Sequence, residues 1–240
     1  MLLTLSNLKA FQADFVPQLI SNFETAFSVK LTDEAKTIRD VLGQINDRLF
    51  QSYTTPTIAA LDTTIKNGIG SADWEPATSR PGQVRPYVYN TMLALVLVHT
   101  EITTTIPIIS PTTSTFTSTS TGHPLLTNVL NHLVTKTSSS LLTAFQSRPK
   151  YSLPALMQAT LDTEFIAQTM AQYVTEEASQ FQSQIYLELD RRTNNEARTK
   201  LQAELGEMRG ILKRLRERTK GEFTCFRKMK PSGSSSKAVA

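Results

Sequence analysis

Cysteine, glycine and histidine are scarce in this chain of 240 residues, and each shortage excludes a class of site. The single cysteine, Cys225, permits neither a disulfide within the chain nor a zinc site built from several thiolates. Nine glycines disfavour a sheet protein with many tight turns. The three histidines, His99, His123 and His132, lack the spacing of metal ligands.

Motifs that cradle phosphate or supply a nucleophile are missing as well. Gly68-Ile69-Gly70 has no third glycine and ends a predicted helix, so it does not match a dinucleotide-binding turn. We therefore assign no catalytic, cofactor-binding or metal-binding residue, and we predict a protein that is not an enzyme and takes no small-molecule substrate. An alternative is a small helical enzyme whose site brings together His99, His132 and Glu164.

Long apolar runs are absent too. The most apolar window, residues 92–98, is far too short to span a bilayer. The N-terminus lacks the basic leader and the long apolar centre of a signal peptide. We therefore predict no transmembrane segment.

Helical periodicity is what the sequence has in abundance. Apolar residues recur at spacings of three and four, and no segment alternates cleanly with the period of a strand. These stripes, with the Pro, Gly and polar breaks between them, predict an all-α fold of about seven helices, arranged as consecutive antiparallel bundles. The predicted helices cover residues 8–27, 33–53, 55–68, 86 onward, 124–148, 152–190 and 197–226.

The first stripe is rich in phenylalanine and is expected to bury a large apolar area. Pro17 lies inside this stripe and predicts a kink or a break near Phe15. Because the stripe starts almost at Met1 without a capping residue, we expect the chain to begin inside a larger architecture. Its members are Leu8, Phe11, Phe15, Leu19, Phe23 and Phe27.

Residues 152–218 predict a pair of long helices joined at the polar sequence 191–195. Helices of this length are common in rods and assembly subunits, which favours a role in binding partners over catalysis. Residues 103–122 are mostly Thr, Ser and Pro and predict a flexible insertion. The expected domains are an N-terminal bundle of residues 1–102, a C-terminal bundle with the long hairpin in residues 123–230, and a disordered tail, 231–240.

Positive charge is concentrated near the C-terminus. Residues 191–230 hold thirteen Lys and Arg against five Asp and Glu, whereas residues 1–190 hold eleven against sixteen. This basic helix has three interpretations: an outer helix of a bundle, a contact with anionic lipid, or a nucleic-acid binder. The candidate basic contact surface comprises Lys213, Arg214, Arg216, Arg218 and Lys220.

Several long stretches resemble the C-terminal part of the Sec-five subunit of the exocyst (exocyst complex component two) in its filamentous-fungal form. The matching strings are residues 27–45, 84–89, 151–169, 184–190 and 201–205. The resemblance covers nearly the whole chain apart from residues 103–122 and the tail. Its specificity comes from the length and combination of these strings, none of which is a catalytic motif.

The resemblance implies stacked helical bundles that form an elongated rod of the tethering-complex type. It implies a non-catalytic subunit without a cofactor, which helps to hold secretory vesicles at the plasma membrane before fusion. The implied partners are other exocyst subunits. The basic helix adds anionic plasma-membrane lipid as a further expected partner, and we expect no nucleic acid. The implied location is the cytoplasmic face of the plasma membrane at sites of polarised growth. The alternative from the residues alone is a basic-helix adaptor that binds anionic lipid or nucleic acid directly.

Overall fold

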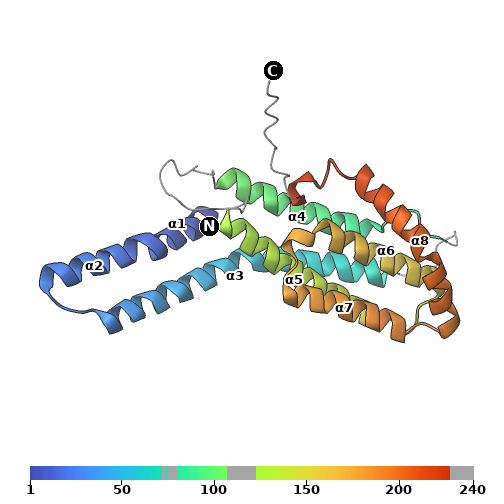
Figure 1. Cartoon of the computed structure of the whole chain (residues 1–240), viewed down its shortest axis with the longest axis horizontal. Coiled ribbons are helices and arrows are strands. Elements are labelled where there is room, and N and C mark those ends of the chain that lie inside the picture. Colours follow the sequence, from blue (N-terminus) through green and yellow to red (C-terminus); the bar gives the residue numbers. More distant parts are fainter. Residues whose placement is uncertain (72–73, 75–79, 107–122, 228–240) are drawn as a thin grey trace, which may run out of the picture.

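Helices form every regular element of the computed structural model, which describes residues 1–71, 74, 80–106 and 123–227. Within these ranges there is no β-strand, which confirms the all-α fold class. A helical hairpin projects from one end of a group of packed helices (Figure 1). The helices are α1 (Leu2–Ala10), α2 (Val16–Phe27), α3 (Thr32–Gly70), α4 (Pro86–Thr105), α5 (Pro124–Gln146), α6 (Leu153–Thr169), α7 (Glu176–Arg191) and α8 (Asn195–Arg218).

The first helical rod contains an irregular turn where a kink or break is expected. A π-helical turn, Phe11–Phe15, joins α1 to α2, so that the three elements run on without a gap. Pro17 follows this turn; it has no N–H and leaves the carbonyl of Ala13 without its α-helical donor, which a wider turn accommodates. The rod ends at Ser28, whose left-handed φ of 52° helps to turn the chain back toward α3.

The predicted division of residues 33–68 into two helices is wrong, because α3 continues through Pro56 as a single helix of 39 residues. Thr55, expected to begin the second helix, is itself helical, and its hydroxyl donates to the carbonyl of Gln51 at 2.6 Å. The half of α3 beyond Pro56 is anchored by buried residues such as Ile65, which is 0% exposed. This packing outweighs the one backbone hydrogen bond that proline removes.

The prediction of a single long helix over residues 152–190 is also wrong, because the structure divides this segment into two helices. The first part, α6, ends at Thr169, and a short 3₁₀ turn, Ala171–Tyr173, leads to α7. The Thr175 hydroxyl accepts a hydrogen bond from the N–H of Ala178 at 3.1 Å and so caps the start of α7. Buried Met170 lies in the break, which is why the apolar stripe continues across it.

The last helix begins at the end of the expected polar break and stops earlier than expected. Asn194 caps it by accepting a hydrogen bond from the N–H of Ala197 at 2.8 Å. The helix α8 ends at Arg218, and only a 3₁₀ turn, Thr224–Phe226, follows. With α1 and α2 counted as one rod, the described residues form seven helical rods, the number predicted. The number is unchanged because α3 replaces two predicted helices, while α6 and α7 replace one.

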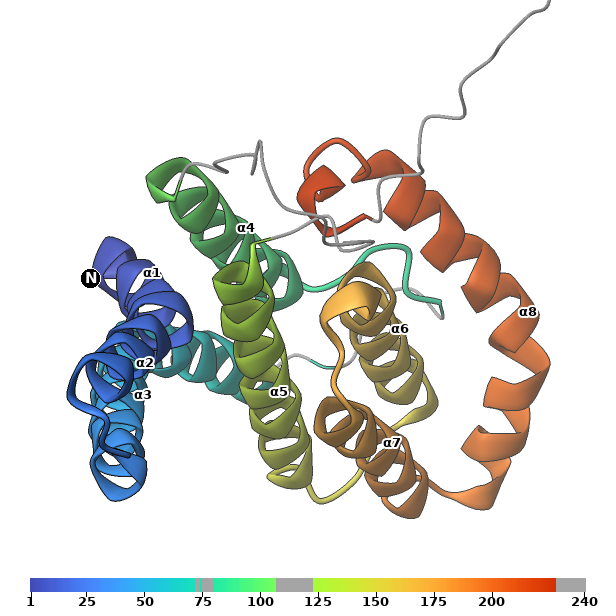
Figure 2. The same cartoon turned by 60° about the vertical axis from the view of Figure 1, so that its left-hand side comes forward.

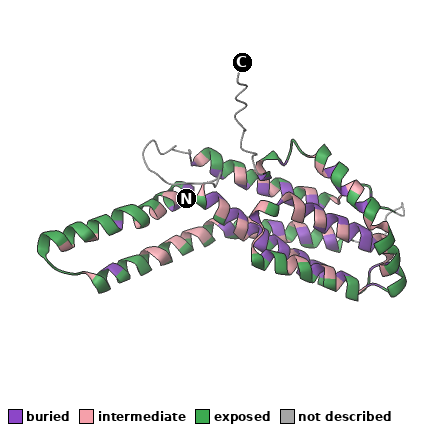
Figure 3. Ribbon diagram, viewed as in Figure 1, coloured by how far each residue is buried: buried purple, intermediate pink, exposed green. Residues whose placement is uncertain are grey.

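The hydrophobic core lies between α4, α5, α6 and α7, with the C-terminal half of α3 packed against it (Figures 2 and 3). Trp74 is buried in this core, and its indole N–H donates to the carbonyl of Ile69 at 2.7 Å. Phe145 and Tyr151 pack edge-on against the Trp74 ring. The core includes residues of α3 and α4, which precede residues 103–122, and of α5, α6 and α7, which follow them. Residues 103–105 belong to α4.

Residues 107–122 and 228–240 lie outside the described part of the chain. The expected flexible insertion falls there except for residues 103–106, and so does the expected disordered tail. The division into bundles of residues 1–102 and 123–230 stays a prediction.

The projecting hairpin consists of α1, α2 and the N-terminal half of α3, and it is largely exposed (Figure 3). The prediction that the phenylalanine-rich stripe buries a large area is wrong for its outer part. Phe15, Leu19 and Phe27 are 54%, 57% and 64% exposed. Such apolar exposure is unusual for a monomer and indicates that the hairpin is an interaction surface.

Candidate functional site

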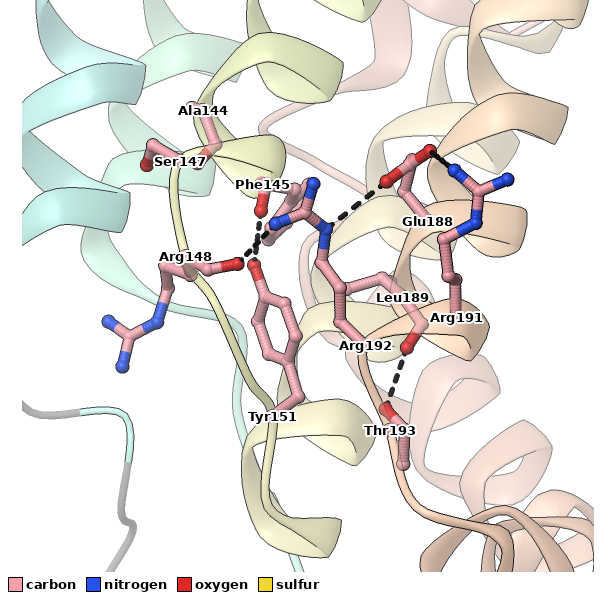
Figure 4. A network of polar contacts seen from close by, with 10 residues as sticks. All are labelled: Ala144, Phe145, Ser147, Arg148, Tyr151, Glu188, Leu189, Arg191, Arg192 and Thr193. Carbon is pink, nitrogen blue, oxygen red and sulfur yellow. Dashed lines mark hydrogen bonds and ion pairs between the residues drawn. The ribbon is translucent and has the colours of Figure 1, made fainter.

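A network of polar contacts fixes the end of the bundle from which α8 departs (Figure 4). The Arg192 guanidinium donates to the carbonyl of Arg148 at 2.7 Å and pairs with the Glu188 carboxylate at 3.1 Å. The Tyr151 hydroxyl donates to the carbonyl of Phe145 at 2.8 Å. These contacts tie the α5–α6 connection to the α7–α8 turn. We assign them a structural role, because each polar group serves a neighbouring backbone or side chain.

A buried carboxyl group, Asp162, anchors the start of α4. It accepts hydrogen bonds from the backbone N–H of Arg85 at 3.1 Å and from the Gln158 amide at 2.8 Å. Burial is the main influence on this group and raises the pKa of Asp162 to about 7, although the hydrogen bonds and the Arg85 charge act in the opposite direction. The Gln158 amide also donates to the carbonyl of Gln83 at 3.0 Å. The cluster therefore holds the loop before α4 against α6.

The residues of the alternative enzymatic site contact different neighbours. Glu164 accepts hydrogen bonds from the Tyr186 hydroxyl at 2.9 Å and from a glutamine amide four residues along α6 at 2.8 Å. His132 packs edge-on against Phe50, and His99 against Phe226. Each side chain thus has a packing or hydrogen-bonding role where it lies.

The described residues include no group of three His, Cys, Asp or Glu side chains that is suited to hold a metal ion. Cys225 is half-buried, and burial raises the pKa of its thiol, which disfavours the reactive thiolate. None of the helices in the described ranges combines the length and the apolar character needed to cross a membrane.

The clearest candidate surface is the set of exposed apolar side chains on the two rods of the projecting hairpin, which we call the apolar hairpin face. On the first rod it carries aromatic pairs: Phe11 and Phe15 have ring centroids 5.3 Å apart, and Phe23 and Phe27 4.5 Å. On α3 the exposed apolar residues follow helical spacing. The members of the apolar hairpin face are Phe11, Phe15, Leu19, Phe23, Phe27, Ile38, Val41 and Ile45, each between 42% and 64% exposed.

The second candidate surface is basic and surrounds a hollow of about 660 Å³ beside the C-terminal half of α8. Two of the five predicted basic residues, Lys213 and Arg216, line it, whereas Arg214, Arg218 and Lys220 are not among its lining residues. Two further cations complete the lining: Arg209, from the same helix, and Arg227, which follows the last 3₁₀ turn.

The structure thus divides the predicted basic surface and adds two residues that the sequence analysis missed. The spacing of Arg209, four residues before Lys213, was a usable indication, because side chains at i and i+4 share a helix face. Arg227 could not be found in this way, because only the turn after α8 brings it back to the helix.

The third candidate surface is a hollow of about 680 Å³ between α6, α7 and α8, where α7 and α8 diverge (Figure 2). Its lining is mainly apolar and includes Leu161, Leu205 and Met208. Leu187 on its border is 68% exposed. The contacts of α8 with α6 bury only one side of the helix here, so that the hollow stays open to solvent.

The fold and these surfaces define a class: an all-helical protein with an exposed apolar hairpin and a basic surface beside its last long helix. Comparison with protein families gives the particular case. The family model of the exocyst complex component Sec5 matches residues 1–226, and the chain belongs to this family. No curated protein and no solved structure matches it. The resemblance of the separate strings is therefore confirmed at the level of the family.

Proposed function

We propose that this chain is a non-catalytic subunit of the exocyst, which helps to hold secretory vesicles at the plasma membrane before fusion. We propose further that the apolar hairpin face packs against amphipathic helices of another exocyst subunit. The observation that carries this proposal is the exposure of large apolar side chains on both helices of one hairpin, in a member of a family named as a complex component.

The composition of the hairpin favours a protein partner over a membrane or a nucleic acid. Residues 1–50 carry five Lys and Arg against six Asp and Glu, so that no excess of positive charge attracts phosphate groups. Apolar residues with the spacing of a helix face are recognised by other helices, whose side chains fit between them. Because each rod of the hairpin presents such a stripe, an amphipathic helix lying along both would bury them together.

The amount of apolar surface suits a stable contact. Phe15, Phe23 and Phe27 are each between 44% and 64% exposed. Covering such aromatic side chains is a typical source of hot-spot energy in interfaces. A tether of this kind works at the cytoplasmic face of the plasma membrane, and in a filamentous fungus we expect it at sites of polarised growth.

Capture of sister subunits tests the proposal directly. The tagged chain, expressed in its host, is purified, and the co-purifying exocyst subunits are quantified by mass spectrometry. The test variant carries Phe15→Gln, Leu19→Gln and Phe23→Gln. Because all three side chains are exposed, folding is expected to persist, and recovery of the subunits is expected to fall at least tenfold.

The matched control replaces exposed apolar residues elsewhere, with Leu93→Gln and Leu97→Gln on α4, at positions that are 38% and 70% exposed. Full recovery is expected with this control. Undiminished recovery with the hairpin variant would remove the hairpin from the interface, and recovery of no exocyst subunit by the unmodified chain would remove the assembly role. A dimer of the isolated chain that the hairpin variant dissolves would assign the surface to a second copy instead.

A further inference from the structure

The basic hollow beside α8 has a wall that is held in place by aromatic residues. Phe223 and Phe226, which follow α8, are buried. Phe223 packs edge-on against Phe165, and Phe226 against Tyr173, with ring centroids 6.0 Å and 6.1 Å apart. The segment that closes the hollow is therefore fixed to the core and is not a loose end of the helix.

Polar contacts hold the opposite sides of the hollow together. The Arg216 guanidinium donates to the side-chain oxygen of Gln168 at 2.9 Å and to its carbonyl at 3.3 Å, which ties α8 to the end of α6. The Arg227 guanidinium donates to the carbonyl of Arg216 at 3.2 Å. The Gln172 amide donates to the carbonyl of Cys225 at 3.5 Å. The shape of the hollow thus exists before any ligand binds.

The charge of the lining is strongly positive. Four cations, Arg209, Lys213, Arg216 and Arg227, line the hollow together with one carboxylate, Glu217. That carboxylate is already paired with Lys220 at 3.1 Å. The hydrogen bond to Lys220 is the main cause that lowers the pKa of Glu217, and the charges of Arg227 and Lys213 add to it.

Two of these cations are available for a ligand. Within the described ranges, Arg209 and Lys213 have no hydrogen-bond or ion-pair partner, and both are exposed. They lie one helical turn apart on α8, so that both can reach the same anion. Arg216 is committed to Gln168 and positions the hollow instead.

We propose that this hollow binds a multiply phosphorylated headgroup, such as that of a phosphorylated inositol. Guanidinium groups grip phosphate oxygens in pairs, and an ammonium group adds a compact charge beside them. A hollow of about 660 Å³ lies within the range of small-ligand sites. The proposal goes beyond a role in assembly, because it assigns a ligand to a surface formed by α8 and the end of α6, whereas the hairpin consists of α1, α2 and α3.

The same features disfavour a nucleic acid. Single strands are held along extended grooves with exposed aromatic side chains on which bases stack. Here the cations surround one hollow, and its aromatic residues, Phe223 and Phe226, are buried in the core. A basic helix that attracts any anion would use all of its cations equally, whereas the hollow selects Arg209 and Lys213 over Arg214 and Arg218.

The experiment measures binding of the purified full chain to inositol trisphosphate by calorimetry, with inorganic phosphate as a second probe. Vesicles of phosphatidylcholine containing phosphatidylinositol bisphosphate are compared with vesicles containing phosphatidylserine at equal charge. The test variant is Arg209→Gln with Lys213→Gln. The matched control, Arg214→Gln with Arg218→Gln, removes two charges at the same spacing on the same helix.

We expect the test variant to lose at least about tenfold in affinity for inositol trisphosphate and the control to lose less than about threefold. Preference for the bisphosphate vesicles over the phosphatidylserine vesicles assigns the site to a lipid headgroup; binding of the soluble probes without that preference assigns it to a free phosphate compound. Equal losses in both variants, tighter binding of single-stranded RNA, or no binding of any phosphate probe would overturn the proposal. Subunit capture does not enter this measurement, so its outcome is independent of the proposed function.

Discussion

Replacing Asp162 by Asn tests the account of the buried polar cluster at the start of α4. Asp162 is 0% exposed, and burial raises its pKa from an ordinary 3.8 to about 7. A raised pKa means that the folded state holds the proton more tightly than the unfolded state does. The stability that this proton contributes is complete below pH 4 and is lost as the pH rises through 7.

The size of the effect follows from the two pKa values. Between pH 5 and pH 8 the unfolded carboxyl is ionised throughout, whereas the folded one passes from protonated to mostly ionised. The free energy of unfolding should therefore fall by about 2–3 kcal/mol over this interval on account of Asp162 alone. In the Asn variant this contribution disappears, because the amide does not titrate.

Burial lowers the pKa of His99, His123 and His132, and these groups act with the opposite sign. Their neutral forms are favoured in the folded state, so they add stability as the pH rises through the range of their titration. Both proteins contain the same histidines, and the difference between their pH dependences isolates Asp162.

The assay is urea unfolding followed by circular dichroism at pH 5 and pH 8 for both proteins. Absolute stabilities are a poor guide, because the new amide group needs its own hydrogen-bond partners. The change between the two pH values is the informative quantity. If it is the same in the two proteins, Asp162 does not titrate as its burial requires, and the reasoning is refuted.

Two further predictions concern α3. Gly68→Ala should destabilise the fold by about 2 kcal/mol or more, because the added Cβ atom would lie 2.2 Å from the Cβ of Tyr87. Gly43→Ala, where nothing lies within 4 Å of the added Cβ atom, should stabilise the fold by about 0.5–1 kcal/mol; thermal unfolding of both variants distinguishes a close helix contact from ordinary helix propensity. Pro56→Ala should raise the free energy of unfolding by about 1–2 kcal/mol, because it restores an N–H donor to the carbonyl of Ser52 at an exposed position; a lower midpoint in urea would show that proline is needed there.

The helices were predictable from the sequence wherever local chemistry and tertiary packing agree. Ser152 and Asn194 cap the helices that follow them, and Pro86 and Pro124 begin theirs, as their sequence positions indicate. At Pro56 the local indication of a break was overruled, because the residues beyond it pack into the same core as a continuation of the helix. At Thr175 the reverse happened: this residue caps the start of α7, although the apolar stripe runs without interruption past the end of α6 at Thr169.

The surfaces were less predictable than the helices. Helical spacing shows which residues share a face, but it does not show whether another helix covers that face. The stripe that includes Phe15 and Leu19 was therefore recognised, while its exposure was not. The basic residues of α8 were recognised as a group, whereas the hollow depends on Arg227, which reaches α8 through a turn that no sequence period describes.

The continuity of α3 has a mechanical consequence. Its 39 residues, at about 1.5 Å each, extend about 60 Å, from the tip of the hairpin into the packed helices. A pull on the outer half is delivered along backbone hydrogen bonds directly to Leu61 and Ile65, without an intervening loop to absorb it. The helix is therefore stiff along its length, and we expect it to bend first at the exposed turn of Pro56, where one backbone hydrogen bond is missing.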